Sequence, residues 1–188
     1  MRPQRFSASL LKVGVLAVAC SLATAPAFAL NSGGSGSDAS STPTCPKGEI
    51  YNSHTGKCEK GSSGLDDKEL YTQGRDLALA GRYDEALTAL KAVTNDKDAM
   101  VLTMLGYTAR KMGNYDDGLA YYQKALAIEP NNVNTHEYLG EAYAEKGKLD
   151  LAKAELEKIS AVCGGTTCDA YKALADAIAG KPDATKTW

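Results

Sequence analysis

Four cysteines downstream of Leu30 are the side chains whose type and spacing could do chemistry. Cys45 and Cys58 enclose a segment with two turn signals, and Cys163 and Cys168 flank a Gly-Gly-Thr-Thr loop. The C-x4-C spacing differs from the C-x-x-C of thiol oxidoreductases, and no βαβ pattern surrounds it. Of the three possible pairings, proximity in the sequence favours Cys45 with Cys58 and Cys163 with Cys168. We therefore expect two structural disulfides and no redox centre.

The sequence contains no motif of a nucleophilic, metal-dependent or phosphate-binding enzyme. It has only two histidines. His54 lies near two cysteines, but cysteines that are oxidised to each other cannot serve as metal ligands. His136 falls where a half-buried packing residue is expected. We predict no catalytic residue, no metal and no cofactor, so we do not expect an enzyme.

Residues 1–29 have the pattern of a secretory signal peptide. Three basic residues precede a short apolar run, and the segment ends in Ala-Phe-Ala at 27–29. The run is too short to span a bilayer well. Lipidation at Cys20 is an alternative, although Leu16 lies four residues before it and lipoprotein signals usually place a leucine three residues before the cysteine. We expect cleavage after Ala29, export to the periplasm, and no membrane span in the mature chain.

Two small segments follow the signal peptide. Residues 30–44 are rich in Gly and Ser, which predicts a flexible linker. Residues 45–58 predict a hairpin closed by a disulfide, whose loop-closure entropy contributes about 3 kcal/mol in a compartment where disulfides persist. Loss of the three basic residues of the signal peptide takes the formal net charge from −2 to −5. This mildly acidic balance argues against nucleic-acid binding.

Residues 66–164 repeat one helical pattern three times. The turn glycines Gly81, Gly113 and Gly147 recur at an interval of about 33 residues, the length of a two-helix repeat unit. Small residues such as Gly106 and Gly118 fall where two antiparallel helices must approach closely. Such a hairpin cannot bury its own apolar face, so it is stable only when it is stacked on neighbours. The pattern predicts helices at 67–80, 83–93, 98–112, 115–128, 133–146 and 149–162.

The period and these residues resemble the tetratricopeptide repeat (TPR) family. Residues 99–130 match best, with the family's Gly106, Tyr115, Ala125 and Pro130 in place. The outer repeats depart from it, with Gln73 for Leu in the first, and His136 for Trp and Gly164 for Pro in the third. The resemblance implies an all-α, TPR-type α-solenoid of about three helix hairpins.

A seventh helix is predicted at 169–179, within a capping segment at 165–180 that precedes a short tail at 181–188. Tyr171, Leu174, Ala175 and Ile178 lie on one face of it. An amphipathic helix of this kind can cover the apolar end of a repeat array. The Cys163–Cys168 loop would fix the angle of the helix and contribute about 2 kcal/mol.

The resemblance further implies that the concave surface, lined by the first helix of each hairpin, binds other proteins. Tyrosines and charged residues occupy it, types that often dominate binding energy at interfaces. Packing of these tyrosines between hairpins is the alternative. The Lys/Asn/Arg clamp of some family members is incomplete in this sequence, so we expect an extended peptide or a helix as ligand. The expected binding residues are Tyr71, Arg75, Thr103, Tyr107, Arg110, Asn134, Glu137, Tyr138 and Glu141.

We therefore predict a non-enzymatic scaffold or adaptor of the cell envelope that binds a protein or peptide partner. The alternative is a glycan- or cell-wall-binding protein that uses the Cys45–Cys58 hairpin. The C-P-x-G-x-x-Y spacing of that hairpin is similar to one loop of the chitin-binding peritrophin knot.

Overall fold

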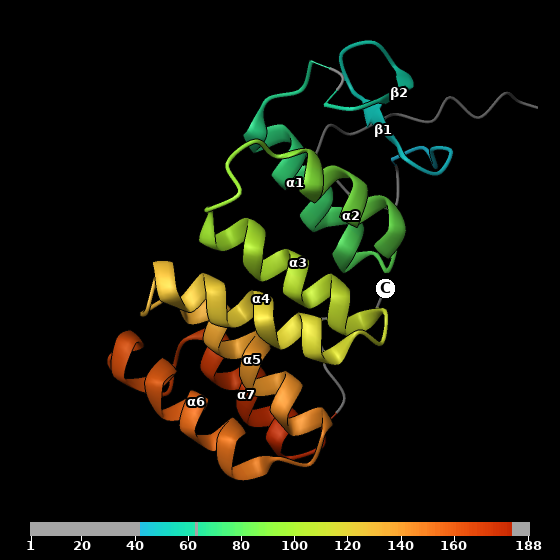
Figure 1. Cartoon of the computed structure of the whole chain (residues 1–188). Helices are drawn as coiled ribbons and strands as arrows, with labels where there is room; N and C mark the ends of the chain where they lie inside the picture. The colour runs from blue at the N-terminus through green and yellow to red at the C-terminus, as the bar shows by residue number, and fades with distance from the viewer. Residues whose placement is uncertain (1–41, 63, 182–188) are drawn as a thin grey trace, which may run out of the picture. The chain divides into compact units, whose positions relative to one another are not determined.

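The computed structural model describes residues 42–62 and 64–181. The predicted signal peptide, most of the predicted linker and residues 182–188 of the tail lie outside the described residues. The described part contains two strands and seven helices (Figure 1), and every helix begins and ends within one residue of its predicted limits. The elements are β1 (Glu49–Asn52), β2 (Lys57–Lys60), α1 (Asp67–Leu79), α2 (Tyr83–Ala92), α3 (Ala99–Lys111), α4 (Tyr115–Ile128), α5 (Val133–Glu145), α6 (Leu149–Cys163) and α7 (Asp169–Ile178).

The N-terminal hairpin is part of the core rather than a separate appendage. Strands β1 and β2 pair antiparallel, with Tyr51 opposite Cys58, and the Cys45–Cys58 disulfide is formed as the spacing predicts. The second strand continues to Lys60, beyond the predicted end of the hairpin at residue 58. Ile50 is buried and packs in one cluster with Leu65 and residues of α1 and α2. The hairpin therefore rests on the first helix pair.

Arg82, at the start of α2, holds the chain that leads into this hairpin. Its guanidinium donates to the carbonyl oxygens of Thr42 and Pro43 and to both carboxylate oxygens of Glu85. Glu85 Oε2 also accepts the backbone N–H of Cys45 at 3.0 Å. Residues 42 and 43, at the end of the predicted flexible linker, are thus hydrogen-bonded to the first helix pair.

The helices α1 to α6 form three antiparallel pairs, and side chains at their starts cap several of them. Asp66 accepts the backbone N–H of Glu69, whose side chain accepts the N–H of Asp66, and the two bonds form a capping box. Asp98 caps α3 through the N–H groups of residues 100 and 101. Satisfying these N–H groups sets where each helix begins.

Glycine is required at the turn and at the crossing of each pair. The turn glycines Gly81, Gly113 and Gly147 have φ values of 76°, 88° and 68°, which other residues rarely adopt. At the α3–α4 crossing, a Cβ on Gly106 would lie 2.7 Å from the Tyr122 ring and 3.0 Å from the carbonyl oxygen of Gly118. The two helices therefore touch through backbone.

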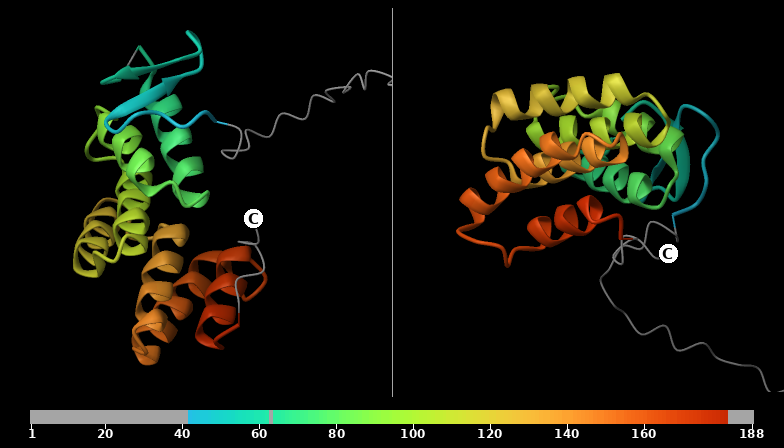
Figure 2. Two further views of the ribbon diagram at one scale, coloured as in Figure 1. Left: turned by 90° about the vertical axis from the view of Figure 1, so that its right-hand side faces the viewer. Right: turned by 90° about the horizontal axis from the view of Figure 1, so that it is seen from below.

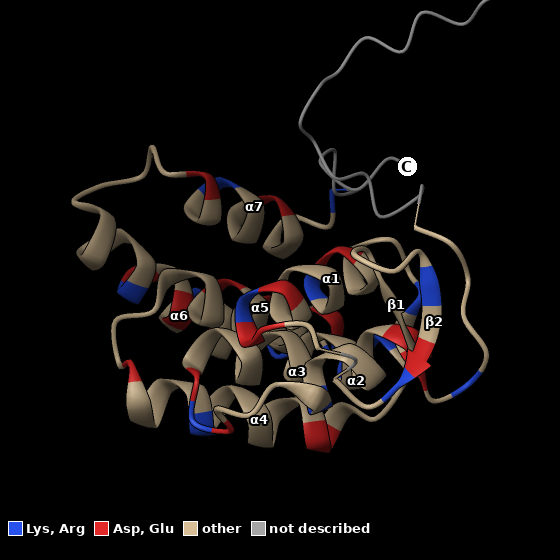
Figure 3. Cartoon of the chain, turned by 90° about the horizontal axis from the view of Figure 1, so that it is seen from above, with Lys and Arg blue, Asp and Glu red and all other residues tan. Residues whose placement is uncertain are grey.

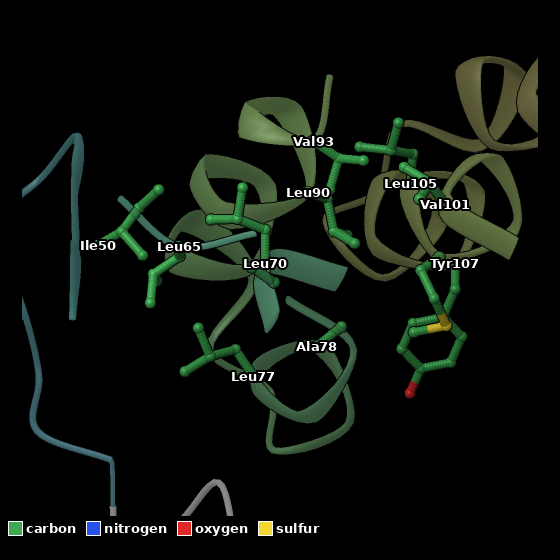
Figure 4. Close-up of a cluster of buried hydrophobic side chains, with 12 residues drawn as sticks. Ile50, Leu65, Leu70, Leu77, Ala78, Leu90, Val93, Val101, Leu105 and Tyr107 are labelled. Carbon is green, nitrogen blue, oxygen red and sulfur yellow. The ribbon is translucent and has the colours of Figure 1, made fainter. Parts of the chain in front are cut away.

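The pairs follow one another in chain order, with α3 near the middle of the stack (Figures 1 and 2). Because α3 packs against α1, α2, α4 and α5, every residue from 101 to 110 is buried. The largest core cluster runs from the N-terminal hairpin into α3 and includes Leu70, Leu90, Leu105 and Tyr107 (Figure 4). This continuous core is what makes the hairpins one folded unit.

The seventh helix packs on α5 and α6 at the end of the stack. Ala170 and Leu174 are buried there against Ile159, with Tyr171 and Ile178 partly buried beside them. The Cys163–Cys168 disulfide, also predicted, joins the end of α6 to the residue before α7. None of the helices in the described part is both long and apolar enough to cross a membrane.

Candidate functional site

The nine residues expected on the concave surface divide into a buried group and an accessible group. Thr103, Tyr107, Arg110 and Glu141 are only 1 to 6% exposed. For these four residues the interpretation as an exposed binding surface is wrong. The sequence places them correctly on the inner faces of α3 and α5, but their depth depends on how closely the neighbouring helices pack.

Arg110 forms a buried ion-pair network between α3 and α5. Its guanidinium donates to Glu141 Oε2 at 2.9 Å and to Glu145, and it lies 5.5 Å from the centre of the Tyr107 ring. Lys111 also pairs with Glu145, at 3.3 Å. Arg110 and Glu141, both expected on the binding surface, are therefore partners of each other.

The electrostatics of the network favour the charged forms. Burial lowers the pKa of the Arg110 guanidinium, but Tyr122 and the carboxylates of Glu141 and Glu145 outweigh this effect and keep the pKa above its ordinary value. Burial also disfavours the charged form of Glu145 and so raises its pKa, but the charge and hydrogen bond of Arg110 bring that pKa below the ordinary value. Arg110 therefore stays charged and holds α3 to α5.

Thr103 contributes a second polar link between the same two helices. Its hydroxyl lies 2.7 Å from the hydroxyl of Thr135 on α5 and donates to the carbonyl oxygen of Ala99 in its own helix. Both threonine side chains are fully buried. The link fixes the register of the second hairpin on the third.

The accessible group includes two tyrosines that belong to the edge of the main core. Tyr71 on α1 and Tyr138 on α5 are half-buried against the cluster that contains Met104 and Tyr107 of α3. The rings of Tyr107 and Tyr138 are 5.2 Å apart. Burial raises the pKa of Tyr71, so its hydroxyl remains protonated.

Charged residues accompany these tyrosines. The Arg75 side chain is 43% exposed and pairs with Asp76 at 2.6 Å, while Glu137 is half-buried and Asn134 is exposed. We call Tyr71, Arg75, Glu137 and Tyr138 the tyrosine face. Both α1 and α5 lie on the side of α3 opposite α4 (Figure 3), so the two helices that carry these residues share one side of the stack.

The polar pair that joins α5 to α6 was not among the residues predicted from the sequence. His136 Nδ1 lies 2.6 Å from Glu155 Oε2, and His136 Nε2 lies 2.8 Å from the carbonyl oxygen of Pro130. A carbonyl oxygen can only accept, so Nε2 donates to Pro130, and Nδ1 is left to form the hydrogen bond with Glu155. His136 is 4% exposed, more buried than expected, and its role is structural.

The Glu155 carboxylate is held charged by its neighbours. Burial raises its pKa, but hydrogen bonds from His136 and Lys158 outweigh burial and bring the pKa below its ordinary value. A signal was present in the sequence, because a histidine at the usual tryptophan position requires a buried hydrogen-bond partner.

The other histidine and the cysteines do not come together in a reactive or metal-binding site within the described residues. Within residues 42–62 and 64–181, no cluster of three or more His, Cys, Asp and Glu side chains could hold a metal ion. His54 lies 3.3 Å from Glu69 in an exposed pair. The four cysteines are bonded to each other in two pairs.

Comparisons with known proteins agree on one family. Residues 109–162 match the family model described as tetratricopeptide repeat. A TPR repeat-containing protein of Borreliella burgdorferi is 37% identical over 70 residues, 37% of this chain and 30% of the relative. The ycf37 protein of Guillardia theta is 30% identical over 95 residues, 47% of this chain and 53% of the relative. The chain thus spans under a third of the first relative and about half of the second.

Solved structures share the fold. SycD, the type III secretion translocator chaperone of Yersinia enterocolitica, superimposes with a TM-score of 0.52 at 19% identity, over 65% of this chain and 86% of SycD. PcrH bound to the chaperone binding region of PopB gives a TM-score of 0.50 at 24% identity, over 62% of this chain and 97% of PcrH. At these identities the likeness concerns the fold alone. Residues 109–162 are thus similar to tetratricopeptide repeats, and the helical array shares its fold with these chaperones.

Proposed function

We propose that this chain is a non-enzymatic interaction scaffold of the cell envelope that binds an extended peptide or a helix of a partner protein on the tyrosine face. The observation that carries the proposal is the pair of half-buried tyrosines, Tyr71 on α1 and Tyr138 on α5, which pack on the same core cluster. Each offers an apolar ring and a polar tip at little entropic cost. Arg75 and Glu137 supply charges of both signs beside them.

The size of the array suits this role. PcrH, which has the same fold, has been solved in complex with the chaperone binding regions of PopB and PopD. Those ligands belong to PcrH and do not identify the partner of this chain. They support the proposal because a TPR array of similar extent can hold a segment of another protein.

The envelope location in this proposal draws on two features of the sequence and structure. Residues 1–29 have the pattern of an export signal. Both cystine bridges of the described part are formed, and disulfides persist mainly in oxidising compartments such as the periplasm. Together these features support export, and the location remains part of the proposal.

The test begins with a partner identified by crosslinking and mass spectrometry of the cell envelope. Because Tyr71 and Arg75 are accessible, Y71A/R75A should leave the fold intact and weaken binding of the purified partner by about tenfold or more. Tyr171 is also half-buried but lies on α7, so Y171A is the matched control and should bind as the wild type does. Undiminished binding by Y71A/R75A, with an unchanged circular dichroism spectrum, would remove the tyrosine face from the proposal.

A second candidate function, glycan binding, is favoured by a cavity of about 420 Å³ between the N-terminal hairpin and α1. Tyr51 and Ser53 of the hairpin region line it together with Thr72, Gln73 and Asp76 of α1. An aromatic residue with hydroxyl, amide and carboxylate groups suits a sugar. Soluble peptidoglycan fragments, added to the full chain in a calorimeter, distinguish the two functions, because T72A should abolish glycan binding and leave partner binding unchanged.

A further inference from the structure

A groove runs along the outside of the stack, between the second helices of the first two hairpins. Helices α2 and α4 both pack on α3 and leave two adjoining cavities of about 590 and 280 Å³ between them. Lys91, Tyr121 and Lys124 line both cavities, so the two form one continuous feature. We call it the lysine groove.

The floor of the lysine groove is apolar. Val101, Leu102 and Leu105 of α3 form it in the larger cavity, and Ala109 continues it in the smaller one. At one end Ile128, the last residue of α4, is 45% exposed and therefore offers apolar surface directly to a ligand. Tyr121 stands half-buried in the middle, next to the same floor.

The rim of the groove is basic. Lys91, Lys97 and Lys124 are exposed, and in the part of the chain that the structure describes none of their ammonium groups lies within ion-pair distance of a carboxylate. Lys124 Nζ lies 5.5 Å from the centre of the Tyr121 ring. The acidic lining residues are Asp96 and Asp117, one in each cavity. The middle of the groove is thus positive on a chain whose net charge is −2.

We propose that the lysine groove binds an acidic amphipathic helix from a partner protein. An apolar floor with cations on its rim is complementary to a helix that carries apolar residues on one face and carboxylates on its flanks. From Asp117 to Ile128 the α4 wall covers eleven residue steps, about 16 Å, which corresponds to about three turns of a docked helix.

This surface is distinct from the tyrosine face. The lysine groove is walled by α2 and α4, whereas the tyrosine face belongs to α1 and α5, on the other side of α3 from α4 (Figure 3). The two sites share no residue, so the array can hold two segments at once. Occupation of one surface therefore leaves the other open.

The experiment titrates the ¹⁵N-labelled full chain with a capped synthetic helix of fourteen residues, with leucines on one face and glutamates on the flanks. The same peptide with lysine in place of every glutamate is the control ligand. We expect amide shifts at residues that line the groove, such as Leu102, Tyr121 and Ile128, with the acidic peptide only. Raising NaCl from 50 to 300 mM should weaken the binding about tenfold, because exposed charges are screened.

Two variants locate the site. K91E/K124E should raise the Kd of the acidic peptide at least tenfold. Lys153 is equally exposed on α6, so K153E is the matched control and should bind as the wild type does. Because the Y71A/R75A substitutions lie on the tyrosine face, this variant should also bind the peptide as the wild type does. A negative result for partner binding on the tyrosine face would therefore not contradict the proposal for the lysine groove.

Four results would overturn the proposal. Equal binding of the acidic and basic peptides, or unchanged binding by K91E/K124E, would show that charge does not select the ligand. Binding of phosphatidylglycerol vesicles that K91E/K124E abolishes, without binding of the acidic peptide, would assign the groove to a membrane surface. Self-association in sedimentation that is lost in K91E/K124E, again without peptide binding, would assign it to a second copy of the chain.

Discussion

The second and third hairpins differ in the side chain that covers the glycine at the crossing of their two helices. In the second, the crossing glycine Gly106 is covered by Tyr122 from the partner helix of the same hairpin. In the third, the equivalent Gly140 is covered by Leu174, which comes from α7. The inner hairpin therefore completes its own core, and the terminal hairpin is completed by a helix that follows it.

The difference extends to the residues around each crossing. Leu102 of the second hairpin corresponds to His136 of the third, and Tyr121 corresponds to Glu155. The apolar positions of the inner hairpin thus become a buried hydrogen-bonded pair in the terminal one. The internal repeat has a hairpin packed on each side, while the terminal repeat closes with a polar pair and an added helix.

The largest expected effect comes from Leu174, because it is fully buried and supplies the missing side of the third hairpin. L174A should lower the free energy of unfolding by about 3 kcal/mol, the range for a large-to-small change in a core. The loss should fall on α5, α6 and α7, with hydrogen exchange faster there than in α3. Urea denaturation and hydrogen exchange measure the two quantities.

Leu151 provides the control for L174A, since it is 47% exposed on α6. L151A should change stability by under about 0.5 kcal/mol. If L174A exchanged as slowly as the wild type in α5 and α6, the third hairpin would be complete without α7, and the contrast between the hairpins would fail.

Alanine substitutions at the two crossing glycines test the difference between the hairpins directly. Their expected effects on stability are the next largest. In G106A the new Cβ meets the Tyr122 ring and the backbone oxygen of Gly118, neither of which can move without separating α3 from α4. In G140A it meets the methyl groups of Leu174, which are the far end of a flexible side chain, and the Cβ of Glu155 at 3.2 Å. We expect a loss of about 2 to 3 kcal/mol for G106A and about 1 kcal/mol for G140A. Equal losses in urea denaturation would contradict the comparison.

The smallest expected effect depends on pH and concerns the polar pair of the third hairpin. The folded-state pKa of Glu155 is below its ordinary value, so the stability from its charge is complete above that value and disappears as the pH falls through the folded-state pKa. E155Q should be about 1 to 2 kcal/mol less stable than the wild type at pH 6. The difference should shrink as the pH falls from about 5 to 3.

Denaturation midpoints across this pH range, for the wild type and E155Q, measure the effect. Glu157 is exposed on the same helix, so E157Q controls for the general loss of carboxylate charge. A difference between wild type and E155Q that stayed constant down to pH 3 would mean that the His136 contact does not depend on the charge of Glu155.

Helix limits and disulfides could be predicted because both depend on local signals. Turn glycines at regular intervals and apolar residues at helical spacing place each helix, and short separations between cysteines restrict their pairing. The role of α7 was also predictable from the amphipathic face around Leu174. What the sequence could not indicate was that Gly140 needs this side chain, since the crossing glycines look alike in all three repeats.

The depth of the concave residues could not be predicted from a single repeat. Tyr107 and Arg110 lie on the expected face of α3, yet α5 packs close enough to bury both. The partner of Arg110, Glu141, is in the next hairpin, so their pairing depends on the angle between hairpins rather than on any local pattern. Tyr71 stays half-buried, and its part in binding remains a prediction.

The hydrogen bonds from Arg82 to the carbonyl oxygens of Thr42 and Pro43 have a mechanical consequence. If the chain is pulled from the N-terminal side of Thr42, the load reaches the turn between α1 and α2 before it reaches the pairing of β1 with β2. The Cys45–Cys58 bond then prevents the strands from peeling apart. The first load is therefore carried by the start of α2, and the strand pair between the two cysteines is spared.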